Sequence, residues 1–550
     1  KFDFNLYRGS GKVTRMMHLL NTKQYLEMRR EAFSNDSATA SISNAPDLIE
    51  WDTTKYTDWQ KVLIGGISNI QDIQGSISGG NLNTQFFLGG GYHRETTVFP
   101  GSNADQKSSL HLNLTHSSDD HKFKLNFTAS FVANNNNILA QDITAFSLYL
   151  PPNTPDLIKS DGTLVWPDGL YLNPFAFLLQ KYKENTYNLI SNGMMSYILF
   201  PGLSLKMSAG FTQMQTSQVQ TDPLSSYNPL FGLTSGDAAF SNNSIRTWIL
   251  EPQIGWHKCV GKHNIDLLAG STFQEDIRQE QTLDATNFSS ESLLENIAAA
   301  GNINPVVSTY LPYKYNAFFS RFTYNYAEKY LLNITGRRDG SSRFGPDKQF
   351  ANFGAIGVGW IFSKEDFIHK AFSFLSYGKI KASYGTAGND QIGDYQYLAT
   401  YSPTIYPYQN QGGLYPTSLF NPDFSWETNK KAEISLEVGM LKDRILFTGS
   451  FYRNRSSNQL VGYPLPLITG GSSVQSNLPA VVQNSGLEIE LNTNNIKTKN
   501  FTWNSSLTLS IPRNKLLSYP NLDQSAYANT YVVGKSLFIK KLSDCPHIGT

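Results

Sequence analysis

The chain has 550 residues, with 45 basic and 44 acidic side chains, so its formal net charge is +1. This balance excludes the basic surface of a nucleic-acid-binding protein and any strong attraction to an anionic membrane surface. Charged residues make up only 16% of the chain, whereas 29 Tyr, 34 Phe and 42 Gly are present. Aromatic residues favour β-strands and Gly favours turns, so the composition predicts an all-β protein with many loops.

The alternation of apolar and polar residues is the main structural signal, and it begins at residues 2–7. The next segment instead has a helical pattern at residues 22–32, for which Asn21 or Thr22 can serve as the N-cap. Alternation returns and is clearest at residues 122–131 and 431–440. Successive side chains of a strand point to opposite faces, so these segments predict a sheet with one apolar and one polar face.

About 17 strands are predicted from this alternation and from the turn residues between the segments. In chain order they cover residues 2–7, 70–79, 82–94, 108–116, 121–133, 189–198, 203–218, 242–258, 262–277, 312–326, 329–338, 351–362, 377–386, 429–439, 444–455, 484–493 and 501–513. Several of them reach about 10 residues, which is enough to cross a bilayer at a tilt, whereas ordinary strands average about 5–6 residues.

Long and short connections alternate between these strands. The long ones are 8–69, 95–107, 134–188, 219–241, 278–311, 339–350, 387–428 and 456–483, and only 363–376 is of intermediate length. An outer-membrane barrel has short periplasmic turns and long extracellular loops. A soluble β-sandwich or propeller, which is the alternative fold, has no reason to gather its long loops at one end. We therefore predict a transmembrane, antiparallel, up-and-down β-barrel with one short loop helix.

Other bulk properties agree with a barrel. No apolar run reaches the roughly 18 residues that a membrane-spanning helix needs. The mean hydropathy of −0.33 is compatible with a barrel, because only every second strand residue faces lipid. The cysteines Cys259 and Cys545 can form one disulfide at most, so the chain is not a disulfide scaffold.

The residues at both ends lead us to expect that the chain is a fragment of a longer protein. Residues 1–7 enter a strand pattern without an initiator Met or a signal peptide, so we expect the natural start to be missing. An odd number of strands cannot close the barrel of a single-chain bacterial outer-membrane protein. We therefore expect residues 1–541 to form a partial barrel and residues 542–550 to be an atypical tail, produced by a frameshift or a truncation.

Four segments resemble the SusC/RagA-type TonB-dependent transporters of Bacteroidetes outer membranes. They are residues 337–345 with the strand that follows, 381–390, 421–428 and 531–534. Each motif is weak by itself, and their order along the chain makes the resemblance specific. The residues taken to carry it are Arg337, Arg338, Asp339, Gly340, Arg343, Asn421, Pro422, Trp426 and Glu427.

The resemblance implies a barrel of about 22 strands, a size class that carries a plugged lumen. It implies an N-terminal plug before Lys1, the TonB–ExbB–ExbD complex acting through that region, and a SusD-like surface lipoprotein as partner. The implied ligand is an oligosaccharide or a peptide, and the implied environment is outer-membrane lipid. No cofactor, metal, nucleic acid or enzymatic activity is expected.

Candidate metal or anion sites are interpreted as structural. His111, His116 and His121 are close in sequence and His257 and His263 flank Cys259, yet all are interpreted as polar residues near the membrane–water boundaries. Residues 89–91, all Gly, predict a bulge or the close approach of a plug rather than phosphate binding. The arginines of the 337–345 motif allow an anion site, but a solvated extracellular ion-pair network is the favoured interpretation.

Aromatic residues fall into two sets. Those at residues 313–330 flank a short turn and predict an aromatic girdle at the bilayer interface. The long loops carry the candidate substrate-binding residues Trp166, Tyr171, Tyr406, Tyr408 and Tyr415, together with Phe175, Phe177 and Tyr401. Such rings can stack on sugars, pack against a lipoprotein partner, or fill the interior of the loops.

The favoured hypothesis is TonB-dependent import of oligomeric nutrients across the outer membrane, with glycans preferred to peptides. One alternative is a passive porin or an adhesin-like barrel without energy coupling. A second is a secreted soluble β-protein that binds or cleaves glycans.

Overall fold

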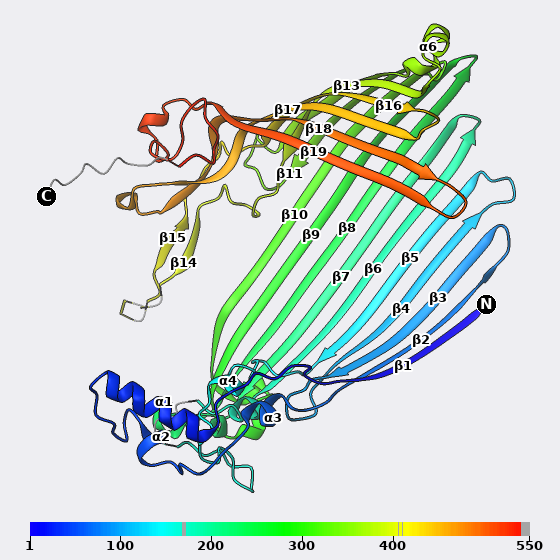
Figure 1. Cartoon of the computed structure of the whole chain (residues 1–550). Coiled ribbons are helices and arrows are strands. Elements are labelled where there is room, and N and C mark those ends of the chain that lie inside the picture. The colour runs from blue at the N-terminus through cyan, green and yellow to red at the C-terminus, as the bar shows by residue number, and fades with distance from the viewer. Residues whose placement is uncertain (168–171, 405, 407, 410, 541–550) are drawn as a thin grey trace. The chain divides into compact units, whose positions relative to one another are not determined.

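The computed structural model describes residues 1–167, 172–404, 406, 408–409 and 411–540. Seventeen strands belong to one large sheet, and β14 (Thr400–Pro403) and β15 (Leu414–Ser418) form a separate two-stranded sheet (Figure 1). Every strand pair with a defined register in the large sheet is antiparallel, as between β2 and β3. Each of the predicted strands overlaps one strand of the large sheet, so the predicted antiparallel all-β fold is confirmed.

The elements have the following bounds. The strands of the large sheet are β1 (Phe2–Gly11), β2 (Ser68–Gly80), β3 (Thr84–Thr96), β4 (Ala104–Ser117), β5 (Phe123–Asn136), β6 (Lys181–Phe200), β7 (Leu203–Asp222), β8 (Asp237–Val260), β9 (His263–Phe288), β10 (Ala300–Tyr326), β11 (Tyr330–Ser341), β12 (Phe350–Trp360), β13 (Leu375–Asn389), β16 (Glu427–Met440), β17 (Ile445–Pro464), β18 (Ser473–Lys497) and β19 (Thr502–Ser518). The α-helices are α1 (Thr22–Asn35), α2 (Pro46–Ile49), α3 (Trp59–Ile64), α4 (Phe146–Tyr149), α5 (Ala176–Leu179) and α6 (Asp366–Ala371). Within the described part of the chain, no helix is both long and apolar enough to cross a bilayer.

Many strands are longer than the sequence predicts. β9 has 26 residues and β10 has 27, and both extend into the segment 278–311 that was predicted to be a loop. The extension of β9 carries polar residues on both faces, as at Gln279, Glu280 and Gln281. Alternation therefore stops before the strand does, which is expected where both faces of a sheet contact water.

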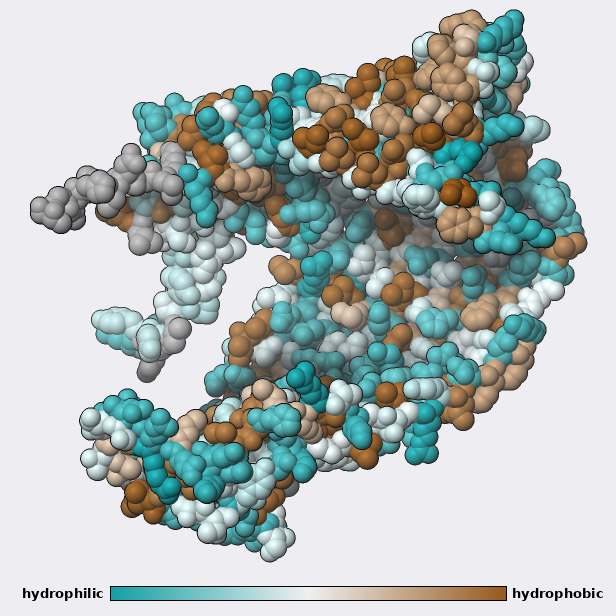
Figure 2. All heavy atoms as spheres, in the orientation of Figure 1, coloured by the Kyte–Doolittle hydropathy of each residue, from teal (hydrophilic) through white to brown (hydrophobic). Residues whose placement is uncertain are grey.

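The chain divides into two compact units. Unit 1 comprises residues 1–194, 209–248 and 276–311, and unit 2 comprises 195–208, 249–275 and the described residues from 312 onward. Within unit 2, the registers bring Ile434, Phe451, Leu487 and Ile511 into one row across β16 to β19. The residues that follow each of them point to the other face and are mostly polar. Figure 2 shows apolar residues gathered over the region of β16 and β17.

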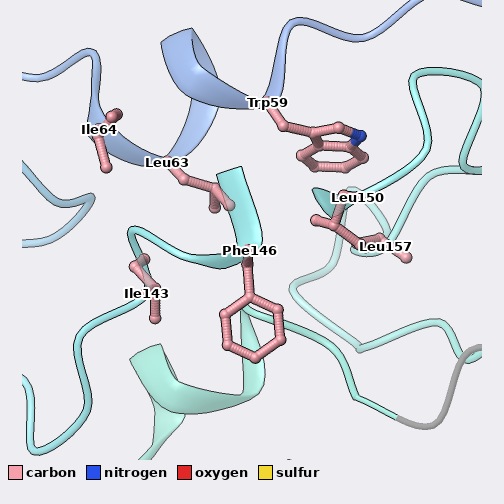
Figure 3. Packing of buried hydrophobic residues seen from close by; sticks show 7 residues of the cluster. All are labelled: Trp59, Leu63, Ile64, Ile143, Phe146, Leu150 and Leu157. Carbon is pink, nitrogen blue, oxygen red and sulfur yellow. The ribbon is translucent and has the colours of Figure 1, made fainter. Parts of the chain in front are cut away.

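Unit 1 contains a folded loop module, which we define as residues 12–67 and 137–167. Its core consists of buried residues of α3, α4 and the adjoining loops, shown in Figure 3: Trp59, Leu63, Ile64, Ile143, Phe146, Leu150 and Leu157. The Trp59 indole N–H donates a 3.0 Å hydrogen bond to the carbonyl of Pro151, and Asn153 Nδ2 donates one of 2.9 Å to the carbonyl of Asp47. The first and third long connections therefore fold as one body.

The predicted loop helix is confirmed as α1 of this module. Its N-cap is Asn21, whose side chain accepts from the backbone N–H of Gln24, while the Gln24 side chain accepts from the N–H of Asn21. This reciprocal pair is a capping box. Arg29 of α1 holds Asp47 through two hydrogen bonds of 2.8 and 3.1 Å, which ties α1 to α2.

Candidate functional site

Two of the motifs predicted from the sequence meet in one buried cluster of unit 2, which we call the motif cluster. Phe344 of the first motif and Phe424 and Trp426 of the other are buried, and the ring centroid of Phe344 lies 4.9 Å from that of Trp426 and 6.0 Å from that of Phe424. The Trp426 indole N–H donates to the carbonyl of Gln349 at 2.8 Å. Segments about 80 residues apart are thus held together at the loop end of β11, β12 and β16.

Arg343 joins a third predicted motif to this cluster. Its Nε donates to Asp394 Oδ1 at 2.8 Å, and its Nη1 donates to the carbonyl of Asp390 at 3.0 Å. Its guanidinium lies 4.1 Å from the ring centroid of Tyr313, whose hydroxyl donates to Asp390 Oδ2 at 2.8 Å. The side chains of Arg343 and Asp394 are only 11% and 8% exposed. The predicted solvated network is therefore wrong here, because long-range packing buries this ion pair.

Arg337 and Arg338 point to opposite faces of β11. Arg337 pairs with Asp339, donates to the Tyr315 hydroxyl at 2.7 Å, and lies 5.3 Å from the Phe319 ring centroid. Arg338 donates to Asn352 Oδ1 at 3.2 Å. Gly340 follows, and a Cβ there would lie 2.5 Å from the Phe350 ring. Because these groups already have partners, the motif acts as an anchor for the loops rather than as an open anion site.

The remaining motif residues also make structural contacts. Asn421 Nδ2 donates to the carbonyl of Gln475 at 2.7 Å, and Glu427 Oε2 accepts from Asn389 Nδ2 at 3.1 Å. A Cβ on Gly345 would lie only 2.8 Å from the carbonyl oxygen of Pro422. Residues 421–427 are thus fixed to β13 and β18 from both sides.

The motif cluster lies beside an exposed aromatic hairpin, which we define as the described residues 395–404, 406, 408–409 and 411–422 around β14 and β15. Residues 395–422 contain no Asp, Glu, Lys or Arg. Tyr401, Tyr406, Tyr408 and Tyr415 are exposed, with Tyr406 at 87% and Tyr408 at 79%. Uncharged rings, amides and hydroxyls here can contact a neutral polar ligand or a partner.

The other candidate aromatic residues lie elsewhere. Trp166 is half-buried in the loop module of unit 1, and Tyr171 lies outside the described residues. Phe175 and Phe177 pack against the core of the loop module, so they fill its interior. Among the described residues of the predicted substrate-binding set, Tyr406, Tyr408 and Tyr415 lie in the aromatic hairpin, and Trp166 does not.

The histidines separate into three environments. His116 contacts Thr84 near the β2–β3 turn, and His121 lies in the β4–β5 turn, while their place at a membrane–water boundary stays a prediction. His111 instead lies in the middle of β4, opposite Gly89 and Ser130, so its predicted place near a boundary is wrong. His257 Nδ1 lies 2.7 Å from Asp266 Oδ1. Among the described residues no group of three His, Cys, Asp or Glu is placed to hold a metal ion.

Sequence reasoning missed a hollow on the polar face of β1 to β4, in unit 1. Its volume is about 500 Å³, and Gly89, Gly90, Gly91, Phe87 and His111 are among the residues that line it. The register of β2 and β3 is uninterrupted from Ile70 to Gly80, so the bulge predicted at these glycines is wrong. The detectable signal was Phe87, an aromatic residue in the polar phase of its strand.

A two-faced sheet of this size, with long loops anchored by three of the motifs, fits a family of membrane barrels. The family model described as "TonB dependent receptor-like, beta-barrel" matches residues 51–537. The chain belongs to this family. The SusC/RagA-type resemblance and the barrel fold are thereby confirmed.

Individual relatives agree with this assignment. The chain is 26% identical over 532 residues to the TonB-dependent receptor P3 of Formosa agariphila, covering 92% of this chain and 51% of that protein. It is also 26% identical to the TonB-dependent receptor SusC of Bacteroides thetaiotaomicron, covering 86% of this chain and 50% of that protein. The chain thus spans about half the length of these relatives.

Solved structures show the same fold. The structure of the RagAB peptide transporter matches with a TM-score of 0.74 and 20% identity, covering 95% of this chain and 62% of that chain. The RagAB peptide importer in its "closed-closed" state matches with a TM-score of 0.75 and 19% identity, covering 97% of this chain and 63% of that chain.

Proposed function

We propose that this chain forms much of the wall of an outer-membrane importer for oligomeric nutrients, with oligosaccharides preferred to peptides. The observation that carries the proposal is the family match over residues 51–537. The row of apolar residues across β16 to β19, backed by a polar face, suits a wall between lipid and a wet lumen. Because a lumen of this size class is plugged at rest, uptake requires energy from a TonB-type complex to displace the plug.

The preference for oligosaccharides is supported by the aromatic hairpin. Peptides carry charged termini and often charged side chains, and ligands of this kind are held by opposite charges. Residues 395–422 offer no charge, but they offer exposed Tyr rings with Gln, Ser and Thr side chains nearby. These groups suit the C–H faces and hydroxyls of a neutral sugar. The proposal includes a SusD-like lipoprotein that delivers the ligand to the aromatic hairpin.

The ligand class can be tested by calorimetric titration of the full-length, detergent-solubilised protein that contains this chain. The probes are maltoheptaose, laminarihexaose and xylohexaose on one side and a tryptic casein digest on the other. We expect one of the oligosaccharides to bind, and a Tyr406→Ala/Tyr408→Ala double variant to bind it about tenfold more weakly. Tyr56→Ala is the matched control, because Tyr56 is an exposed tyrosine of the loop module. Binding of the peptides alone would contradict the preference for glycans.

Energy coupling separates active import from the passive porin alternative. Cells that express the full-length protein should accumulate the radiolabelled ligand, and a protonophore should abolish the accumulation. Uptake that continues to equilibrium in protonophore-treated cells would support a passive barrel instead.

A further inference from the structure

The connection between β12 and β13, residues 361–374, begins on the apolar face of the sheet, and we call it the rim segment. Trp360 lies opposite Tyr330 of β11 and opposite Ile380 of β13, so these three side chains share one face. It is also the face of the apolar row across β16 to β19, because Ile380 pairs with Leu436, two residues after the β16 member of that row. The rim segment therefore leaves the sheet beside aromatic residues of its apolar face.

Phe362 fixes the start of the rim segment against this face. Gly378 lies two residues before Ile380, on the same face of β13, and it pairs with Val438 of β16. A Cβ on Gly378 would overlap the ring of Phe362, so only glycine leaves room for that ring. The rim segment therefore folds over the apolar face of the sheet and not over the polar face.

Glu365 holds the next part of the rim segment, immediately before α6. Its carboxylate accepts hydrogen bonds from the Tyr330 hydroxyl at 2.8 Å and from the Trp360 indole N–H at 3.3 Å. It also pairs with Lys329 Nζ at 2.9 Å. A helix of six residues is not stable by itself in water, so these contacts at its N-cap decide where α6 lies. Figure 1 shows α6 at the end of β13 that is away from β14 and β15.

Three phenylalanines follow these contacts, and all are exposed. Phe367 is 62% exposed, and Phe372 and Phe374 are 46% and 49% exposed. Grouped apolar rings of this kind are unfavourable in water and mark a surface that contacts another apolar phase. A plug in the lumen lies against the polar face of the sheet, whereas these rings follow contacts on the apolar face. The last turn of α6 adds His369 and Lys370, whose polar ends can reach lipid phosphates.

We propose that the rim segment binds the lipid surface, with its three phenylalanines in the headgroup region of the leaflet on the short-turn side. The aromatic residues at the rim of a membrane barrel lie at this depth. Because Glu365 ties the rim segment to Tyr330 and Trp360, the phenylalanines continue the same level of the barrel. The inference goes beyond nutrient import, and it rests only on the part of the proposed function that gives the sheet a lipid-facing side.

Depth-dependent fluorescence quenching tests this inference. The full-length protein that contains this chain, with its cysteines replaced by serine, carries a bimane label on Phe367→Cys in phosphatidylcholine vesicles. The vesicles contain lipids with a nitroxide either on the headgroup or near the end of the acyl chain. Interfacial side chains lie about 5–10 Å deep, so the headgroup nitroxide should quench about twice as strongly as the acyl-chain nitroxide. Quenching by neither lipid would overturn the inference.

Labels at other positions serve as controls. Asp119→Cys lies in the β4–β5 turn, where residues 118–122 are all polar, so its label should be quenched mainly by aqueous iodide. Ile434 is 53% exposed on the apolar face, so a label on Ile434→Cys should be quenched most by the acyl-chain nitroxide. Phe372→Cys repeats the test at a second ring, which keeps the inference testable if Phe367→Cys does not fold.

The outcomes separate this inference from the proposed function. If lipid quenches the label at Ile434 but only iodide quenches the labels at Phe367 and Phe372, the wall faces lipid and only the role of the rim segment is refuted. If neither lipid nor iodide reaches the labels at Phe367 and Phe372, another protein segment covers them, which also refutes that role. If lipid does not quench the label at Ile434, the membrane wall of the proposed function falls as well.

Discussion

The indole N–H of Trp426 donates a 2.8 Å hydrogen bond to the backbone carbonyl of Gln349, which joins the start of β16 to the connection before β12. Replacing Trp426 by Ala removes one of the two hydrogen bonds to that carbonyl, which also accepts from the Ser341 N–H at 3.1 Å, and removes the ring against which Phe344 and Phe353 pack. We expect the free energy of unfolding to fall by about 3–5 kcal/mol. Urea titration of the detergent-solubilised protein measures it. Trp503→Ala is the control, since Trp503 is 53% exposed and lies outside the cluster, and an equal loss in both variants would refute the assignment of Trp426 as an anchor.

Stability should depend on both the charge and the planar guanidinium group of Arg343. Methionine at this position leaves the buried carboxylate of Asp394 without its partner, which costs about 3–5 kcal/mol. Arg343→Lys keeps the charge but cannot hold Asp394, the Asp390 carbonyl and the Tyr313 ring together, so an intermediate loss is expected. Limited proteolysis of residues 390–426 reports the loosened loops. Arg338→Lys, in β11 and outside this ion-pair network, should change the cleavage rate little.

The loop module should loosen at alkaline pH. Burial, followed by the negative charge of Asp47, raises the pKa of Tyr25 to about 12. The unfolded value is about 10, so the folded state favours the neutral phenol. Its stabilising contribution is complete below about pH 10 and is lost as the pH rises through about 12.

A difference titration at 295 nm checks this prediction. The absorbance change lost in Tyr25→Phe should be centred near pH 12, and proteolysis within residues 12–67 should accelerate over the same pH range in the wild-type protein. Tyr56→Phe is the control, because Tyr56 is 57% exposed. A transition for Tyr25 centred near pH 10 would contradict the assigned environment.

Alanine substitutions at two glycines of β2 should change the stability of the sheet in opposite directions. Gly80 has a φ of +137°, and a Cβ there would lie 2.0 Å from the Thr84 carbonyl oxygen, so Gly80→Ala should disrupt the β2–β3 turn. Gly75 has no atom within 4 Å of its Cβ position. Gly75→Ala should therefore stabilise the sheet, by about 0.4–1 kcal/mol, because it restricts the unfolded chain. Refolding yield and urea midpoints in the same detergent compare the two, and destabilisation by Gly75→Ala would refute this account.

The strands of the sheet could be predicted from the sequence because the alternation of apolar and polar residues is a local pattern. Lipid or an apolar neighbour covers one face, so period two is visible in each strand by itself, as at residues 122–131. The end of β9 could not be predicted, because polar residues on both faces of its extension remove that signal, and Gly301, Asn302 and Pro305 at the start of β10 favour a turn. The helix α1 was found because Asn21 and Gln24 form its capping box within four residues.

The contacts within the motif cluster were harder to predict from the sequence than the strands. The motif at residues 337–345 could be recognised by resemblance, but nothing local shows that Phe344 packs on Trp426 or that Asp394 buries against Arg343. Such long-range contacts decide whether an arginine is solvated. Likewise Phe87 stands in the polar phase of its strand in the sequence, but only the register shows that it lies opposite Ser78 and Asn113.

The length of β8, β9 and β10 affects where a ligand first meets the protein. A strand of 27 residues spans roughly 90 Å, about three times the thickness of the hydrocarbon layer of a bilayer. Even at a tilt of about 45°, such a strand is longer than the roughly 40–45 Å of a bilayer with its headgroups, so it extends beyond the membrane. A fluorophore attached near residue 293 should therefore escape quenching by spin-labelled lipids, and quenching there would contradict this position.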